Sequence, residues 1–124
     1  MIGEMTQKKP THNELLKAVA AYLGEELASA SPLGATLKFA YTEGGCIAID
    51  GTGPQVRVVA EDVPADCTIT LSLDTHMEML RFELDQGHAF QQGKMRISGD
   101  IGAALRLAPR ISKPFQFLSA GDEG

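Results

Sequence analysis

The sequence predicts a small α+β domain, in which one β-sheet has helices packed against it. Three observations predict this class. An amphipathic helical segment comes first, four segments with a period of two follow, and the chain then alternates helix, strand and helix. The 124 residues suffice to bury about two thirds of the unfolded surface in one core. Since we find no internal repeat, low-complexity tract or linker, we expect a single domain.

The first helix is predicted after a polar N-terminal tail. Residues 1–12 contain a proline and no apolar pattern, so we expect them to be flexible. Asn13 is the expected N-cap, and the helix is expected to end within residues 29–32. Apolar residues then recur at helical spacing, while the charged residues fall on the other side: Leu15, Leu16, Val19, Ala20, Leu23 and Leu27.

The middle of the chain predicts four strands. "ATLKFAY" (residues 35–41), "CIAID" (46–50) and "QVRVVAED" (55–62) alternate apolar and polar side chains and are separated by short glycine turns. These features are typical of an antiparallel meander. The fourth segment, residues 67–73, alternates strictly, which gives it one apolar face and one polar face.

The last third predicts a helix, a strand and a helix. Asp74 or Thr75 is expected to cap a helix with Met77, Leu80 and Leu84 on its apolar side, flanked by Met79 and Phe82. Residues 85–93 are expected to form a loop. A strand at 94–98, a turn at Gly99 and a helix capped by Asp100 should follow. Two prolines, Pro109 and Pro114, end regular helix, and residues 119–124 form a polar C-terminal tail.

The composition disfavours several classes of protein. A net charge of -5 and a pI near 5.1 give no electrostatic reason to bind nucleic acid. The N-terminus shows no signal sequence, and no apolar stretch reaches the roughly 20 residues that a membrane span needs. We therefore expect a cytoplasmic protein. Cys46 and Cys67 are interpreted as reduced, buried side chains, with a disulfide as the alternative.

No constellation typical of catalysis or metal binding is found in the sequence. His12, His76 and His88 lie on three different segments, without metal-ligand spacing, and "HMEML" lacks the second histidine of a zinc-protease helix. His76 is expected to be exposed in the first turn of its helix. There is no nucleophile elbow, and "GTGPQV" is interpreted as a turn because no helix follows it. We predict no enzyme activity, no cofactor and no metal.

Methionine and phenylalanine side chains concentrate in the last third of the chain. Such side chains fill irregular gaps in a dense core, and they also line adaptable binding cavities. The residues themselves favour the core interpretation and leave the cavity open. They are Met77, Met79, Phe82, Phe90, Met95, Phe115 and Phe117.

One stretch resembles a known family. "ADCTITLSLDTHMEML" followed by "AFQQGKMRISGDIGAALRL" is similar to the pattern of the sterol carrier protein type 2 domain. That pattern is a Thr-rich alternating strand, a helix, an Ala-Phe pair, a Gly-Lys strand, a Gly-Asp turn and a small-residue helix. The resemblance covers residues 65–107 and implies a domain at 13–118. It implies a single five-stranded, largely antiparallel sheet covered on one face by helices, with an apolar tunnel between them.

The resemblance also implies a set of lipid-binding residues. Four are carried over by position: Phe90, Met95, Ile97 and Leu105. Five more are chosen from helical phase and from the need for a cover over the tunnel: Met77, Leu80, Leu84, Phe115 and Phe117. Gly93 and Gly99 are expected to bound the strand. The two prolines near the C-terminus interrupt the last helix of the family pattern, which leaves open whether this segment closes the tunnel.

The function that the resemblance implies is carriage of a lipid without catalysis. The expected partner is a fatty acyl chain, a sterol or an isoprenoid, with transient contact to a membrane or an enzyme. The alternative is an accessory factor that presents a lipid or isoprenoid intermediate to partner enzymes, for example in quinone biosynthesis. A third hypothesis is an acyl-ester hydrolase that uses His76 and His88. The chain ends in "GDEG" and lacks a peroxisomal address.

Overall fold

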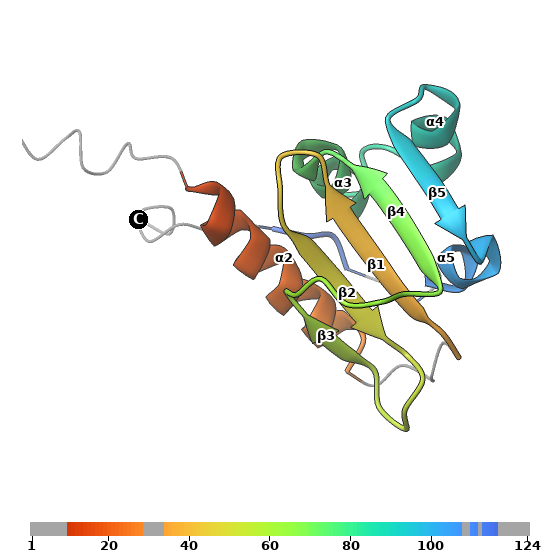
Figure 1. Ribbon diagram of the computed structural model, residues 1–124. Coiled ribbons are helices and arrows are strands. Elements are labelled where there is room, and N and C mark those ends of the chain that lie inside the picture. The colour runs from red at the N-terminus through yellow and green to blue at the C-terminus, as the bar shows by residue number, and fades with distance from the viewer. Residues whose placement is uncertain (1–9, 29–33, 108–109, 112, 117–124) are drawn as a thin grey trace, which may run out of the picture.

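A computed structural model describes residues 10–28, 34–107, 110–111 and 113–116 of the chain. Four helices and five strands lie in these ranges (Figure 1). In chain order they are α2 (His12–Glu26), β1 (Thr36–Tyr41), β2 (Cys46–Asp50), β3 (Arg57–Val59), β4 (Cys67–Leu71), α3 (Leu73–Leu80), α4 (Gln86–Gln91), β5 (Met95–Gly99) and α5 (Ile101–Leu107).

The strands form one five-stranded sheet in the order β3-β2-β1-β4-β5. The β1–β4 pair is parallel and the other three pairs are antiparallel. Phe39 lies opposite both Ile47 and Ile69, and Ile69 lies opposite Ile97, so these four side chains share one face of the sheet. The predicted α+β class, with a largely antiparallel sheet, is confirmed.

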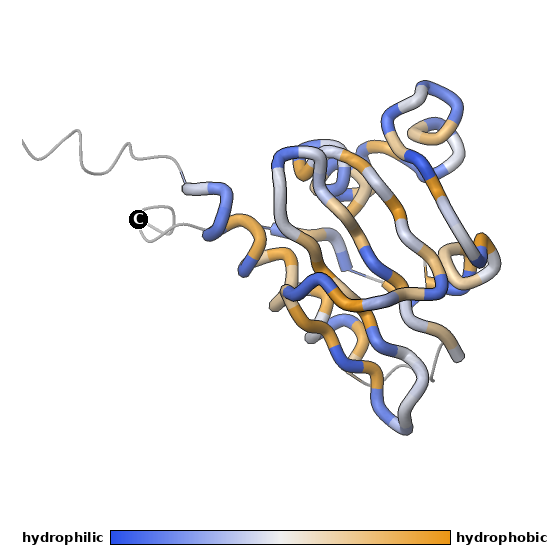
Figure 2. The backbone as a smooth tube through the Cα atoms, in the orientation of Figure 1, coloured by the Kyte–Doolittle hydropathy of each residue, from blue (hydrophilic) through white to orange (hydrophobic). Residues whose placement is uncertain are grey.

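The helices cover the apolar face of this sheet. Figure 1 shows α2, α3 and α5 behind the strands, and the core lies between the two layers. Along the strands, apolar positions alternate with polar ones (Figure 2). Lys38, Thr68 and Thr70 point to the opposite face and remain partly exposed. Both cysteines are free, and Cys67 is buried at the start of β4.

The N-caps of α2 and α3 lie earlier in the chain than the sequence predicted. Thr11, not Asn13, caps α2, because its hydroxyl accepts from the Glu14 backbone N–H while the Glu14 carboxylate accepts from the Thr11 N–H. Ser72, not Asp74 or Thr75, caps α3, and its hydroxyl accepts from the Thr75 backbone N–H at 3.0 Å. Both caps have an extended backbone, which puts the hydroxyl within reach of the first turn. The described helix α2 also ends at Glu26, before residues 29–32.

The predicted loop at residues 85–93 is wrong, because this segment contains the short helix α4. The Asp85 side chain caps it by accepting the His88 backbone N–H at 2.8 Å. Ala89 is buried beneath it, and Gly93 ends it with a positive φ of 74°. A helix of six residues carries too little periodicity to be distinguished from a loop in the sequence.

Gly99 lets the end of β5 lie directly against the start of β4. Its φ is +93°, and a Cβ added there would lie 2.2 Å from the Asp66 carbonyl oxygen. The next residue, Asp100, donates its N–H to that same oxygen at 2.8 Å. The Asp100 carboxylate then accepts the Gly102 N–H at 3.0 Å, so α5 begins beneath β4 as predicted.

The C-terminal segment at 113–116 packs between α2 and α3. Phe115 is buried, its ring lies edge-on to that of Tyr22 at 5.3 Å, and its N–H donates to the Leu80 carbonyl. The Tyr22 hydroxyl donates to the Lys113 carbonyl. Burial, together with the nearby charge of Glu26, raises the pKa of Tyr22 to about 12. These contacts hold the segment that follows α5 against the helical layer.

Candidate functional site: an apolar cavity under the helices

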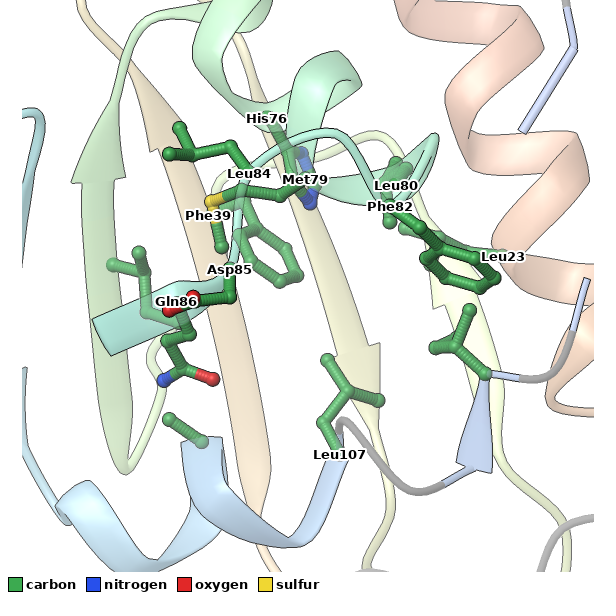
Figure 3. A pocket seen from close by; sticks show the side chains of 13 residues that line it. Leu23, Phe39, His76, Met79, Leu80, Phe82, Leu84, Asp85, Gln86 and Leu107 are labelled. Carbon is green, nitrogen blue, oxygen red and sulfur yellow. The ribbon is translucent and has the colours of Figure 1, made fainter. Parts of the chain in front are cut away.

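A cavity of about 340 Å³ lies between the sheet and the helical layer (Figure 3). Its volume falls within the range of about 300–1,000 Å³ that is typical of ligand sites. The wall is almost entirely apolar. Residues from both layers line it: Leu23, Phe39, Ile69, His76, Met79, Leu80, Phe82, Leu84, Asp85, Gln86, Ala104, Leu107 and Ile111.

The cavity exists because one of the side chains in its wall is small. Phe39 of β1 and Ile69 of β4 form the floor on the sheet. From α5, Leu107 and Ala104 line the cavity, and Ala104 is buried and carries only a methyl group. A larger apolar side chain at that position would occupy the volume directly. The cavity therefore depends on a small residue in α5.

The segment between α3 and α4 borders the mouth of the cavity. Phe82 and Asp85 are exposed there, and Leu84 and Gln86 are half-buried. Hydrogen bonds from His88 lower the pKa of the Asp85 carboxyl below its usual range, so this group is ionised near neutral pH. Asp85 is the one charged residue among the described residues that line the cavity.

Phe82 has a strained backbone conformation at this mouth. Its φ is 64°, and it is the one non-glycine residue with positive φ in the described part of the chain. The Phe82 N–H donates to the Met79 carbonyl and the Glu83 N–H to the Glu78 carbonyl, which is the Schellman motif at the end of α3. Glycine is usual at this position. The chain instead places a large aromatic ring, 56% exposed, beside the cavity.

We expect Phe82→Gly to stabilise the fold and to weaken ligand retention. Relief of the left-handed strain should raise the melting temperature by about 3 °C, while loss of the ring opens the mouth and raises the ligand dissociation rate. Phe90→Gly is the matched control, since Phe90 is also exposed but lies in α4 outside the cavity. It should lower the melting temperature and leave the dissociation rate unchanged. Calorimetry and stopped-flow release of a fluorescent fatty acid measure both quantities.

His76 is the buried polar side chain of the cavity wall, whereas Asp85 is exposed and Gln86 is half-buried. Its side chain projects from α3 beside Phe39 (Figure 3) and is only 2% exposed. The two rings are stacked with centroids 4.1 Å apart, and Nδ1 lies 2.7 Å from the Tyr41 hydroxyl. Burial lowers the pKa of His76 to about 3, so the imidazole is neutral near pH 7. It therefore offers hydrogen bonding without a charge.

The sequence-based expectation that His76 is exposed is wrong. Because Ser72 caps α3, Leu73 begins the helix, and the positions 73, 76, 77 and 80 form one stripe at i, i+3, i+4 and i+7. His76 lies on this stripe, between Leu73 and Leu80, and faces β1. The spacing is present in the sequence, but a cap at Asp74 or Thr75, two or three residues after Ser72, excludes Leu73 from the helix and hides the stripe.

The structure brings only part of the predicted lipid-binding set to the cavity. Leu80 and Leu84 line it. Met77, Met95 and Phe115 are buried in the core outside the cavity wall, and Ile97 is half-buried on β5. Phe90 and Leu105 are 55% and 62% exposed. Phe117 lies outside the described residues. Contact of any of these nine side chains with a lipid stays a prediction.

Most residues of the cavity wall were not among the predicted binding residues. Phe39 and Ile69 were recognised as strand residues, but only the pairing of β1 with β4 brings them together. Met79 and Phe82 were noted beside the α3 stripe. Nothing in the sequence indicates that Ala104 borders a cavity, since a small side chain leaves open space only where its neighbours in the fold do not fill it. Leu23 and Ile111 come from opposite ends of the chain.

Two kinds of feature were not found among the described residues, namely a cluster of metal-ligating side chains and a membrane-spanning helix. No group of three or more His, Cys, Asp or Glu side chains among them is placed to hold a metal ion. In the same part of the chain, no helix is both long and apolar enough to cross a bilayer.

Comparison with known families agrees with this geometry. The model described as the SCP-2 sterol transfer family matches residues 7–111, which span the helical layer and the whole sheet. The chain belongs to the SCP-2 sterol transfer family. Membership makes it a lipid-binding domain of the SCP2 type. The predicted recognition of the family is confirmed.

Two comparisons show how much of the chain is shared with SCP2 proteins. Sterol carrier protein 2 of Gallus gallus is 39% identical over 49 residues, which are 40% of this chain and 9% of the chicken protein. The solution structure of sterol carrier protein domain 2 of Helicoverpa armigera superposes with a TM-score of 0.67 at 19% identity. The superposition covers 82% of this chain and 90% of that one. This chain thus matches a small part of its longer relative and most of the separate domain.

Two further solved structures share the fold. The "UbiJ-SCP2 Ubiquinone synthesis protein" superposes with a TM-score of 0.60 at 19% identity, covering 83% of this chain and all of that one. Palmitated SCP2L2 of Aedes aegypti superposes with a TM-score of 0.53 at 22% identity, covering 87% of this chain and all of that one. The fold also occurs within an enzyme, the sec-alkylsulfatase Pisa1 of Pseudomonas sp., where it covers 14% of the chain with a TM-score of 0.50. SCP2-like domains therefore occur both alone and within larger proteins.

Proposed function

We propose that this protein binds and carries a single lipid, such as a fatty acyl chain, a sterol or an isoprenoid, in the cavity beneath α3 and α5. The observation that carries the proposal is an almost wholly apolar cavity of about 340 Å³ in a member of the SCP-2 sterol transfer family. The palmitated Aedes aegypti relative supports it, since that protein holds an acyl chain on the same fold.

The mechanism is transfer of apolar surface out of water. Each buried methylene contributes about 0.8 kcal/mol, so ten would contribute about 8 kcal/mol before the costs of association. A dissociation constant of about 1 μM requires about 8.2 kcal/mol, and part of the gain is lost when the ligand is immobilised, so micromolar affinity requires more than ten buried methylenes. Phe39 and Ile69 supply the floor and Leu107 a side wall, and no covalent step is part of the proposal.

Native mass spectrometry of gently purified protein, with lipid extraction from the same sample, tests this function. We expect one lipid adduct per chain and displacement of a bound fluorescent fatty acid by the extracted lipid. Denatured protein is the control, since it should carry no adduct. A protein that shows no adduct, and takes up neither the fluorescent fatty acid nor a fluorescent sterol, would contradict the proposal.

A second candidate function is presentation of a lipid or isoprenoid intermediate to partner enzymes. Four large apolar side chains are exposed in the described part of the chain. Phe82 lines the cavity, Phe90 lies on α4, and Ile101 and Leu105 lie on α5. Phe115, which is predicted as part of a cover over the tunnel, is buried and cannot contribute to an exposed apolar patch. An isoprenoid in the lipid extract, together with enzymes that co-purify stably, would favour this function over simple carriage.

A further inference from the structure

The hydrogen bond between Tyr41 and His76 fixes where the imidazole carries its proton. The Tyr41 side chain is buried, and within the described part of the chain its hydroxyl has no hydrogen-bond partner other than His76 Nδ1, at 2.7 Å. A buried hydroxyl hydrogen without an acceptor is costly, so the phenol donates to Nδ1. Nδ1 must then be unprotonated, and a neutral ring carries its hydrogen on Nε2.

The Nε2–H group has no hydrogen-bond partner among the described residues, and it belongs to a side chain that lines the cavity. No described residue accepts from it, yet every fully enclosed side-chain nitrogen or oxygen in the described part has a hydrogen-bond partner. Nε2 is therefore not fully enclosed, although His76 as a whole is 2% exposed. Because His76 lines the cavity, we infer that the space beside Nε2 is the cavity itself. A buried donor that points into an apolar cavity lacks only an acceptor.

The charges around the cavity decide which acceptor suits this donor. Among the described residues, neither Lys nor Arg lines the cavity, and Asp85 puts a negative charge at the mouth. Burial lowers the pKa of His76 to about 3, so the ring does not become a cation near neutral pH. A carboxylate placed beside His76 would be desolvated without a countercharge. A neutral oxygen carries no such cost.

We propose that the His76 Nε2–H recognises a neutral oxygen acceptor, a carbonyl or hydroxyl oxygen, in the lipid that this cavity holds. The inference rests on the proposed lipid-binding function and adds the chemical class of the recognised group. The donor selects among apolar ligands of equal length, and it orients the chosen one with its oxygen under α3. Ligands with an ionised head group bind with that group toward solvent instead.

Three probes of matched chain length test the inference: dodecane, methyl laurate and laurate. Their affinities are measured by displacement of a fluorescent fatty acid from the full chain and from the double variant Tyr41→Phe/His76→Phe. The double substitution removes the donor and its partner together, so no buried hydroxyl is left unpaired. Dodecane reports on cavity shape alone, which separates loss of the hydrogen bond from a change in packing.

The unsubstituted protein should bind methyl laurate about fivefold more tightly than dodecane, and the double variant should lose this preference. A change of cavity volume caused by the new phenylalanine should affect dodecane and methyl laurate alike, so the readout is the ratio of these two affinities, and laurate should follow dodecane. A preference for the ester that persists in the double variant would overturn the inference and leave lipid binding intact. If the double variant lost affinity for laurate as much as for methyl laurate, the inference would also be overturned, because the recognised group could then be a carboxylate. Failure of all three probes to bind would overturn both proposals.

The tautomer provides a readout that packing alone does not move. In long-range ¹H–¹⁵N correlation spectra at neutral pH, His76 should show protonated Nε2 and unprotonated Nδ1. Methyl laurate should shift the Nε2 resonance, and dodecane should not. Tyr41→Phe, which leaves the ring in place, should allow both tautomers. A spectrum with Nδ1 protonated in the unsubstituted protein would contradict the assignment directly.

Discussion

Ala104→Phe should reduce the affinity for a fluorescent fatty acid by about fiftyfold while the protein remains folded. Ala104 is a buried residue of α5 that lines the cavity, and its methyl group leaves open the space that a ligand would fill. If the new ring displaces about three methylenes of the ligand at about 0.8 kcal/mol each, the binding free energy falls by about 2.4 kcal/mol. This loss corresponds to a decrease in affinity of about fiftyfold. Fluorescence titration measures it, and circular dichroism checks the fold.

The neighbouring position provides the control for this substitution. Leu105 lies on the same helix but is 62% exposed and outside the cavity wall. Leu105→Phe adds similar bulk and should leave the affinity unchanged. Ala104→Met is the milder variant if the phenylalanine overpacks the core. Unchanged affinity in both folded Ala104 variants would mean that the ligand binds elsewhere, and a loss in Leu105→Phe would restore Leu105 as a binding residue.

The free energy of unfolding should fall by about 2 kcal/mol between pH 7 and pH 5 because of His76 alone. The side chain is buried, and desolvation lowers its pKa to about 3 in the folded protein, against about 6.5 in the unfolded chain. Between these two values the unfolded state binds the additional proton. Stability therefore rises with pH through this window and is lost as the pH falls from about 6.5 toward 3.

Urea unfolding at a series of pH values measures this slope. The double variant Tyr41→Phe/His76→Phe is the comparison, since it removes the titrating group while His12 and His88 remain. We expect its unfolding free energy to be nearly constant from pH 7 to pH 5. An equal slope in both proteins would show that another group causes the pH dependence, and it would argue against a neutral, buried His76.

The fold could be predicted largely from the sequence because the signals for its longer elements are local. The alternation in residues 67–71 identifies β4, and the spacing of Leu16, Val19 and Leu23 identifies α2. The predicted helix caps lie two or three residues too late, since Thr11 and Ser72 compete with neighbouring polar residues for the same role. Helix α4 was missed because its six residues contain little periodic signal.

The binding site could be predicted only in part, for a different reason. Leu80 and Leu84 were chosen because they continue an apolar stripe, and both line the cavity. Phe90 and Leu105 were chosen by position in the family pattern, and both side chains are exposed. Whether an apolar side chain packs against the core or borders a cavity depends on the volume of the residues opposite it. The residues opposite belong to other segments of the chain, so the pattern around the apolar side chain does not reveal their volume.

The sequence by itself determined the α+β class, the family and the absence of a familiar catalytic motif, since each follows from the order and spacing of nearby residues. The tertiary structure alone decided where the cavity lies and which polar atom faces it. The parallel β1–β4 pair places Phe39 beside Ile69, α5 places Ala104 in the cavity wall, and α3 places His76 against Tyr41. These contacts join segments that are about 30 or more residues apart, and only packing of the two layers brings them together.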